Sequence, residues 1–296
     1  MRLLLLDIGG TAIKGSFCID EDMGPIHEIP SQAIKGGNVL IENVTKLITS
    51  MEKEHGRADA IGICTAGRVD VKKGLITYAN ENIPGYTGMK VKEIIEKRFQ
   101  VPAYIENDVR AAAIGEGTYG DASPFSDYLT LTYGTGIGGA IVMGKEIYRG
   151  SDGSAGEFGL LVTHAEDVVD GIPYSGCYEK YGSVTALVNK AKELDPFLSD
   201  GRKIFEHIEV YKVRNIVEEW CHEVAIGLSS LIHIFNPPCI ILGGGIMQQA
   251  LVESLVKSKV SSLMIGDIDE VCIKSASLGN MAGIYGMRAI IEADFL

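Results

Sequence analysis

The stretch LLLLDIGGTAIKGSFCI, from Leu3 to Ile19, decides how the chain begins. An apolar run ends in Asp7, a Gly-Gly-Thr turn follows at residues 9–11, and a second run alternates in polarity. Because glycine has no Cβ, such a turn can present bare backbone N–H groups to an anion. Asp7 would then face a metal ion and Thr11 a phosphate oxygen. A plain β-hairpin with Asp and Gly as ordinary turn residues explains the same letters equally well.

The composition is that of a globular chain long enough for two domains. Of 296 residues, 46% are hydrophobic and 22% are charged. Lys plus Arg number 27 and Asp plus Glu 39, and the net charge of −12 argues against nucleic acid or an anionic membrane as the main partner. Asp7 interrupts the apolar start too early for a signal peptide, and no segment is long enough to span a membrane. We therefore expect a cytoplasmic protein, with its six cysteines as free thiols because no pair has CxxC spacing.

Strand-like runs alternate with helical stretches, which predicts an α/β fold with helices packed on a sheet. Around residues 119–126 the sequence changes to Gly, Asp, Ala, Ser and Pro before a new strand begins. We expect residues 1–118 to form a smaller N-terminal α/β domain, completed by a C-terminal helix near 281–296, and residues 119–280 to form a larger one. Since no flexible linker separates them, we expect the two domains to pack closely around a cleft.

The second half begins as the first does. YLTLTYGTGIGGAIVMGKEIY is again a strand, a glycine-rich turn and a strand, and this echo of the first hairpin is carried by Thr132, Gly134, Thr135 and Gly136. Two phosphate-type hairpins, one in each domain, could hold one ligand from opposite sides. Later, a buried strand runs into Gly243, Gly244 and Gly245. These glycines could admit a flat nucleoside, although a tight strand-to-helix turn explains them almost as well.

Two nucleotide-binding motifs match only partly. Gly134, Gly136 and Gly139 spell GxGxxG, but strand propensity continues where a dinucleotide fold needs a helix. The stretch from Gly139 to Lys145 matches most of the P-loop, but Glu146 stands where a hydroxyl should hold magnesium. We interpret both matches as accidental and predict a hairpin turn at residues 143–146.

IENDVRAAAIGE places Asn107 and Asp108 where a strand ends and a helix begins. Ligands of α/β proteins collect at such ends. A carboxylate there can accept a hydroxyl proton during attack on phosphorus, and Asn107 can orient a neighbouring hydroxyl. Helix capping is the ordinary use of both residue types. Other polar groups suited to a polyhydroxylated ligand are Gly67, Arg68, Asn80, Asn82 and Glu157.

In this order and spacing, the motifs resemble the ROK family of sugar kinases, within the actin, hexokinase and Hsp70 superfamily. The resemblance covers the whole chain. Its motifs are DIGGT at residues 7–11, AGRVD at 66–70, END at 106–108, GTGIGG at 134–139, AGEFG at 155–159 and LGGG at 242–245.

The resemblance implies two ribonuclease H-like domains around a cleft, a homodimer, and transfer of the γ-phosphate of ATP to a hydroxyl of a hexose or hexose derivative. It implies that Asp108 is the base and that Asp7 positions Mg²⁺ through water. The ATP- and phosphate-binding residues would be Asp7, Gly9, Gly10, Thr11, Lys14, Thr132, Gly134, Thr135, Gly136, Gly243, Gly244 and Gly245. The sugar-binding residues would be Gly67, Arg68, Asn82, Asn107, Asp108, Glu157 and Glu179.

One family feature is missing from this sequence. Many ROK proteins carry a His after the GExG segment and a cysteine cluster that together hold a structural zinc. Here Leu160 stands at the His position and only Cys177 remains of the cysteines. One thiolate cannot close a tetrahedral zinc site, so we expect no structural zinc. Glu179 matches the family Glu that reaches the sugar, although its neighbours differ.

A glucokinase-like kinase is the leading interpretation, and others stay open. β-Glucoside kinases and some N-acetylmannosamine kinases also lack the zinc, and the latter carry an Arg at the position of Arg68, although a surface pair with Asp70 explains that residue as well. In another class, the chain would be a non-catalytic sugar sensor or regulator. Repressors of the family add a basic helix-turn-helix region. This acidic chain begins with the hairpin, so we expect no direct contact with DNA.

Overall fold

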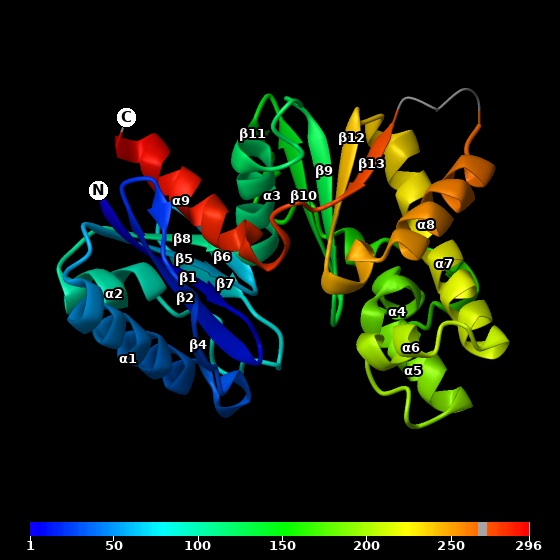
Figure 1. Ribbon diagram of the computed structural model, residues 1–296, viewed down its shortest axis with the longest axis horizontal. Helices are drawn as coiled ribbons and strands as arrows, with labels where there is room; N and C mark the ends of the chain where they lie inside the picture. The colour runs from blue at the N-terminus through cyan, green and yellow to red at the C-terminus, as the bar shows by residue number, and fades with distance from the viewer. Residues whose placement is uncertain (266–270, 296) are drawn as a thin grey trace. The chain divides into compact units, whose positions relative to one another are not determined.

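The structure is a computed structural model that describes residues 1–265 and 271–295. These residues divide into two compact units, each built around its own β-sheet (Figure 1). Unit 1 comprises Met1–Gly120, Gly150–Ser154 and Met281–Leu296, and unit 2 comprises Asp121–Arg149 and Ala155–Asn280. The predicted α/β fold is confirmed.

The sheet of unit 1 has the strand order β3-β2-β1-β5-β8, with β4 also paired to β2. Strand β1 is antiparallel to β2 and parallel to β5, which in turn is parallel to β8. A separate two-stranded ribbon joins β6 and β7. The strands are β1 (Arg2–Ile8), β2 (Ala12–Ile19), β3 (Asp22–Met23), β4 (His27–Pro30), β5 (Ala60–Thr65), β6 (Arg68–Asp70), β7 (Leu75–Tyr78) and β8 (Ala103–Asn107).

Helices cover both faces of this sheet, which explains why β1 is apolar on both sides. Alternate residues of a strand point to opposite faces. Leu4 and Leu6 pack with the buried side chains of α1 (Gly37–His55) and α2 (Val91–Phe99). Leu3 and Leu5 pack with those of α3 (Asp108–Tyr119) and α9 (Ala282–Phe295). A 3-10 turn, η1 (Ala33–Lys35), precedes α1.

Unit 2 repeats the central connectivity of unit 1. Its strand order is β11-β10-β9-β12-β13, in which β9 is antiparallel to β10 and parallel to β12. Asp7 in β1 and Thr132 in β9 occupy the same penultimate position of the first hairpin strand, as the internal repeat predicts. The strands are β9 (Tyr128–Tyr133), β10 (Ile137–Met143), β11 (Glu146–Ile147), β12 (Cys239–Gly243) and β13 (Cys272–Ser275).

The core of unit 2 lies between its sheet and two long helices, α7 (Tyr211–Phe235) and α8 (Ala250–Leu263). Shorter elements complete the unit: η2 (Phe158–Leu160), η3 (Ala165–Asp167), α4 (Glu179–Gly182), α5 (Val184–Leu194), α6 (Gly201–Glu206), η4 (Gly245–Gln248) and η5 (Gly279–Met281). Within the described ranges, no helix combines the length and the apolar character needed to cross a bilayer.

The structure also bears out the two exclusions among nucleotide motifs. Strand β10 begins inside the GxGxxG match, so the helix that a dinucleotide fold requires is absent from this part of the described chain. Gly144 and Lys145 form the turn between β10 and β11, both with positive φ, at 59° and 66°. MGKE is therefore a hairpin turn, as predicted, and not a P-loop.

The C-terminal helix α9 packs very closely against α3 in unit 1. A Cβ on Gly115 would lie 2.3 Å from the Ala282 carbonyl oxygen, and one on Gly286 would lie 1.7 Å from the Ala111 carbonyl oxygen. Glycine at these two positions allows the two helix backbones to approach. The last helix of the chain thus completes the hydrophobic core that the first strand begins.

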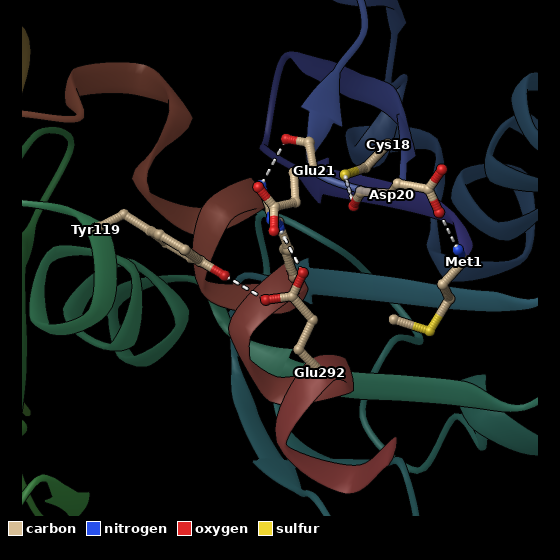
Figure 2. Close-up of polar contacts among 7 residues, drawn as sticks. Met1, Cys18, Asp20, Glu21, Tyr119 and Glu292 are labelled. Atoms are coloured by element: carbon tan, nitrogen blue, oxygen red, sulfur yellow. Dashed lines mark hydrogen bonds and ion pairs between the residues drawn. The ribbon is translucent and has the colours of Figure 1, made fainter. Parts of the chain in front are cut away.

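Polar contacts also join α9 to the rest of unit 1 (Figure 2). The Tyr119 hydroxyl donates to Glu292 Oε2 at 2.5 Å, and Arg288 Nε donates to Glu292 Oε1 at 2.7 Å. Arg288 Nη1 also donates to the Glu21 carbonyl, which follows the end of β2. Asp20, directly after the end of β2, pairs with the Met1 amino group at 2.5 Å. These contacts link α3, α9 and the β1–β2 hairpin.

One short segment lies outside its predicted domain. Gly150–Ser154 belongs to unit 1, whereas the sequence placed it in the domain of residues 119–280. The physical reason is a side-chain contact, since Arg110 Nη2, on α3, donates to the Gly153 carbonyl at 2.6 Å. No sequence pattern within Gly150–Ser154 predicts that this segment belongs to unit 1.

Replacing Tyr119 by Phe tests the contribution of the contacts around α9. The change removes a hydrogen bond to a partly buried carboxylate, and we expect the free energy of unfolding to fall by about 1–3 kcal/mol. Tyr104→Phe is the matched control, because its hydroxyl donates to the exposed Asp294 at the same helix, and its loss should cost less than about 1 kcal/mol. Urea unfolding of both variants measures the difference, and equal losses would contradict this account.

Candidate active site

The first group of predicted site residues lies at the turn between β1 and β2. Gly9 N donates to the Ala12 carbonyl at 2.9 Å, and Ser31 holds the outer side of the turn by donating to Gly10 O from its hydroxyl at 2.7 Å and to Thr11 O from its backbone at 2.9 Å. Neither glycine has positive φ, and a Cβ on Gly10 would meet no atom within 4 Å. Gly10 therefore keeps the space beside the backbone open, whereas a Cβ on Gly9 would lie 3.2 Å from the Ala12 carbonyl oxygen within the turn.

Asp7, the penultimate residue of β1, lies beside two other groups of unit 1. In the sheet it pairs with Cys64 on β5 and with Lys14 on β2. The Cys64 thiol lies 3.6 Å from Asp7 Oδ1 and 3.4 Å from the Leu6 carbonyl, and burial holds its pKa well above the usual value. It is therefore a neutral donor to the Asp7 carboxylate. Burial raises the pKa of Asp7, while Cys64 and Lys14 act in the opposite direction.

Asn107 and Asp108 lie at the junction of β8 and α3, as predicted. Asn107 Oδ1 caps the helix by accepting from Val109 N and Arg110 N, both at 3.1 Å. Its Nδ2 donates to the Gly67 carbonyl at 3.0 Å and to Asp108 Oδ1 at 2.8 Å. The side chain thus uses the whole hydrogen-bonding capacity of an amide within unit 1. Capping and the positioning of Asp108 are performed by the same residue.

The carboxyl of Asp108 has an unusual acidity. The surrounding protein desolvates it and the nearby Asp7 charge repels it, and together they raise its pKa to about 6 despite the hydrogen bonds from Val109 N and Asn107. The residue nevertheless keeps part of its surface exposed, so a ligand can reach it. A carboxylate with a pKa near neutrality is suited to accept and release a proton.

The other predicted residues of unit 1 surround a loop next to this junction. Gly67 has a φ of 97° and gives its carbonyl to Asn107. Arg68 lies over the Tyr78 ring, with its guanidinium carbon 5.8 Å from the centroid. Asp70, the partner suggested for Arg68, pairs with Lys73 at 3.1 Å. Asn82 lies in an exposed loop, where its backbone donates to Asn80.

In unit 2, the glycines of the two motifs GTGIGG and AGEFG pack against one another. A Cβ on Gly139 would lie 2.3 Å from the Phe158 ring and 2.4 Å from the Gly156 carbonyl oxygen. A Cβ on Gly136 would lie 2.4 Å from Glu179 Oε2, which accepts from Ile137 N at 3.3 Å. These glycines make room for a neighbouring chain segment and for the Glu179 carboxylate. Glu157, between the glycines of the second motif, is exposed.

A cavity of about 670 Å³ opens over the two remaining glycine turns of unit 2. Gly134 and Gly245 line it, and a Cβ on either would meet no atom within 4 Å. Gly243 lies in β12 against Thr132, and Gly244 has a φ of 110°. The other lining residues are Tyr133, Val184, Gly201, Arg202, Phe205, Glu206, Ile246 and Gln249. Apolar walls with polar groups at the rim suit a flat heterocycle.

The segment that corresponds to the family zinc site is built from other contacts. Cys177 is buried, which raises the pKa of its thiol, and it bridges to Val162 in a short antiparallel pairing. Leu160 is 40% exposed. His164 stacks on Tyr181 with ring centroids 3.6 Å apart. The absence of the family's structural zinc from this segment stays a prediction.

Sequence reasoning missed several residues that the structure brings to these groups. Cys64 belongs to no motif, although it lies level with Asp7 in the sheet. Ser31 lies 20 positions beyond Thr11 and meets it only because β4 pairs with β2. The cavity residues on α6 carry no motif. Only the mixture of polar and apolar residues at positions 201–206 could have suggested that this segment lines a cavity.

Replacing Asp108 by Asn should stabilise the protein at neutral pH. A folded-state pKa of about 6 against 3.8 means that the native state binds the proton more tightly, so this group's stabilising effect is present below pH 3.8 and is lost as the pH rises through 6. The difference corresponds to about 3 kcal/mol. Asn retains the Oδ1 acceptor.

Urea unfolding should therefore show Asp108→Asn to be more stable than the parent by up to about 3 kcal/mol at pH 8, and equal to it below pH 4. A variant that is no more stable at pH 8 would show that the carboxyl is not desolvated as described.

Two glycines of one hairpin should respond differently to alanine. Gly139→Ala places a Cβ against the Phe158 ring and a backbone oxygen, and we expect a loss of at least about 1–3 kcal/mol in unfolding free energy. Gly134→Ala meets open space at an ordinary φ, so its effect should stay within about 0.5 kcal/mol. Similar unfolding midpoints for the two variants would refute the packing argument.

Comparison with known proteins agrees with this arrangement of motifs. The family model described as "ROK family" matches residues 4–294. An uncharacterised protein of Clostridium perfringens is 34% identical over 98% of this chain and 98% of its own length. The xylose repressor of Bacillus spizizenii is 27% identical, over 97% of this chain and 74% of the repressor.

A solved structure shares both the fold and part of the sequence. The ROK family glucokinase from Streptomyces griseus, in complex with glucose and AMPPNP, superposes with a TM-score of 0.86 at 26% identity. The match covers 98% of this chain and 99% of the glucokinase. With the family model matching nearly its whole length, this chain belongs to the ROK family.

Proposed function

We propose that the protein is an ATP-dependent sugar kinase that transfers the γ-phosphate of ATP to a hydroxyl of a hexose or hexose derivative, in the manner of a glucokinase. The observation that carries the proposal is Asp108, a reachable carboxyl whose pKa is raised to about 6 and whose orientation is held by Asn107. Membership of the ROK family and the likeness to a glucokinase that binds glucose and AMPPNP support it.

Asp108 acts as the general base. Above about pH 6 it is a carboxylate, and it accepts the proton of the sugar hydroxyl as that oxygen attacks the γ-phosphorus. Asn107 and Val109 N both donate to Oδ1, so we assign Oδ2 to the incoming proton. The remaining catalytic contribution is positioning of the two reactants and exclusion of water, since phosphoryl transfer asks little covalent chemistry of the protein.

Asp7 is the residue that would position Mg²⁺, through water. The donor chemistry fits, because Mg²⁺ is bound by oxygen ligands and Asp7 offers a partly exposed carboxylate at a strand end. Its desolvated charge beside that of Asp108 is also a place where a cation relieves repulsion. When bound, Mg²⁺ neutralises charge on the phosphates. Besides Asp7, this part of the proposed site comprises the open turn at Gly9–Thr11 and Lys14.

We assign the nucleotide to the two hairpins and to the unit 2 cavity. The base would occupy the space over Gly134 and Gly245, where no side chain obstructs a flat ring. Thr132, Thr135 and Gly136 on one hairpin, and Gly10 and Thr11 on the other, would donate hydrogen bonds to phosphate oxygens. Gly243 and Gly244 shape the cavity edge. In this proposal, both predicted domains contribute residues to the reaction. These domains are residues 1–118 with 281–296, and residues 119–280.

The sugar would contact Gly67, Arg68, Asn82, Asn107, Asp108, Glu157 and Glu179. Since Asn107 already makes four hydrogen bonds, a sugar hydroxyl would replace one of them. N-Acetylmannosamine and β-glucosides are the alternative substrates within the proposal. A homodimer and a cytoplasmic location complete it. The six cysteines are free thiols, as a reducing compartment requires.

A sugar-responsive regulator is the second candidate, and the xylose repressor favours it. Its sequence matches this chain over nearly the whole chain's length. A regulator of this kind would need sugar binding but no turnover. The base and the phosphate hairpin residues are present here, and they support catalysis over sensing alone.

Asp108→Asn should lower kcat by about 10²–10⁴-fold, because an amide cannot accept the proton. Sugar binding should persist, since the Oδ1 acceptor remains. In the parent protein, kcat/KM should fall with decreasing pH through about 6. ADP release with glucose, mannose, glucosamine, N-acetylmannosamine and cellobiose, together with calorimetric binding of the best substrate, measures these effects.

Asp20→Asn is the control for this experiment, because Asp20 is exposed and pairs only with the chain's amino terminus in the described contacts. It should keep parental turnover. Near-normal phosphorylation by Asp108→Asn would refute the assignment of the base. Sugar binding by the parent without turnover on any substrate would favour the regulator.

A further inference from the structure

A second cluster of ligand-type side chains lies in unit 1, away from the residues assigned above. His27 on β4 comes close to Glu54 and His55 at the end of α1, and one ligand atom of each lies within 4.8 Å of the other two. The sheet produces this meeting, because β4 pairs with β2 and α1 packs on β2. None of the three residues belongs to a ROK motif quoted above or to the segment around Cys177.

One imidazole nitrogen of each histidine in this cluster, Nε2, lacks a hydrogen-bond partner among the described residues. Nε2 of His27 and Nε2 of His55 are both buried, and neither has a hydrogen-bond partner in the described part of the chain. A buried polar atom without a partner destabilises the folded state, so native proteins rarely leave two together. A metal ion that accepts both lone pairs removes this cost. Glu54 Oε1 lies 3.7 Å from His55 Nε2, beyond hydrogen-bond range.

Packing holds the two rings in place. The His55 ring lies 5.4 Å from the Phe17 ring and 5.7 Å from the His27 ring, which meets it edge-on at 76°. Glu54 is the mobile member, because its side chain is 59% exposed and can turn toward the two nitrogens. The cluster therefore combines two pre-oriented nitrogen donors with one adaptable oxygen donor.

The local charges select the kind of ion. His55 is the last residue of α1, where the helix dipole favours a cation, and Glu54 adds a negative charge. Arg2 opposes a cation, because its guanidinium donates to the His55 carbonyl and lies over the Phe17 ring. An ion held mainly by charge, such as Mg²⁺ or Ca²⁺, is disfavoured here. A borderline ion that prefers imidazole nitrogen gains enough from the two histidines.

We propose that His27, Glu54 and His55 form a binding site for Zn²⁺, with the fourth position of the tetrahedron open to water. The ion ties the C-terminal end of α1 to strand β4. The site is independent of the proposed kinase function and of the family's cysteine-based zinc site, with which it shares no residue.

Isothermal titration with Zn²⁺ alone, on full-length protein first treated with a chelator, tests the proposal. We expect one equivalent to bind, and His27→Gln to weaken that binding by at least about tenfold, because removal of even a supporting group of a metal site costs about 10–100-fold. His207→Gln is the matched control, since His207 is exposed and lies in unit 2. It should bind Zn²⁺ as the parent does.

Two further measurements exclude other sources of binding. Co²⁺ in place of Zn²⁺ should give a nitrogen- and oxygen-ligand spectrum without thiolate charge transfer, because no cysteine belongs to the site. Zn²⁺ should raise the thermal midpoint of the parent and of His207→Gln, but not that of His27→Gln. Equal Zn²⁺ affinity in parent and His27→Gln, absence of binding, or a thiolate band would each overturn the proposal.

His27 is the safer position for this test because it lies on a short strand and is partly exposed. Glu54→Gln, at an exposed side chain, gives a second variant that does not disturb the fold. It should weaken Zn²⁺ binding while leaving the midpoint of the metal-free protein unchanged. Unchanged Zn²⁺ affinity in Glu54→Gln would remove the carboxylate from the site.

Discussion

The candidate active site depends on the parallel pairing of three strands, β1, β5 and β8. Their carboxyl ends lie at one edge of the unit 1 sheet, with Asp7 level with Cys64 and Asn107 level with Thr65. The leucines before Asp7 are buried on both faces, so β1 cannot slip by one residue without turning each leucine to the opposite helix layer. Packing of the core thereby holds two carboxyls, Asp7 and Asp108, near one another.

That proximity has an electrostatic cost, and the neighbouring groups offset only part of it. Asp108 accepts hydrogen bonds from Asn107 and Val109, and Asp7 accepts one from the Cys64 thiol. The pKa values of both acids are still raised. Separating the two carboxyls would stabilise the fold, so their proximity supports the proposed functional role of the pair. The raised pKa of Asp108 suits this carboxyl to its proposed role as a base near neutral pH.

Much of the fold followed from the sequence, because its signals are local and repeated. Apolar runs that end in glycine turns predicted both hairpins, and the break at Glu146 correctly excluded a P-loop. The reasons for individual glycines were not visible. Gly139 and Gly156 serve to pack two segments that are 17 positions apart, and Gly136 admits the carboxylate of Glu179. These needs arise only when distant segments meet.

Asn107 shows why a motif alone does not assign a role. From the sequence, helix capping and a contact with a ligand hydroxyl were competing interpretations of the same amide. In the structure, Asn107 Oδ1 caps α3, and this fixes the rotamer in which Nδ2 donates to Asp108. A hydroxyl that accepts from Asn107 Nδ2 must replace the Gly67 carbonyl or the Asp108 carboxylate as acceptor. Release of the Gly67 carbonyl would leave the bond from Asn107 to Asp108 in place. If Asp108 is the base, as proposed, the loop of Gly67 and Arg68 is therefore where the identity of the sugar would act on the geometry of the reaction.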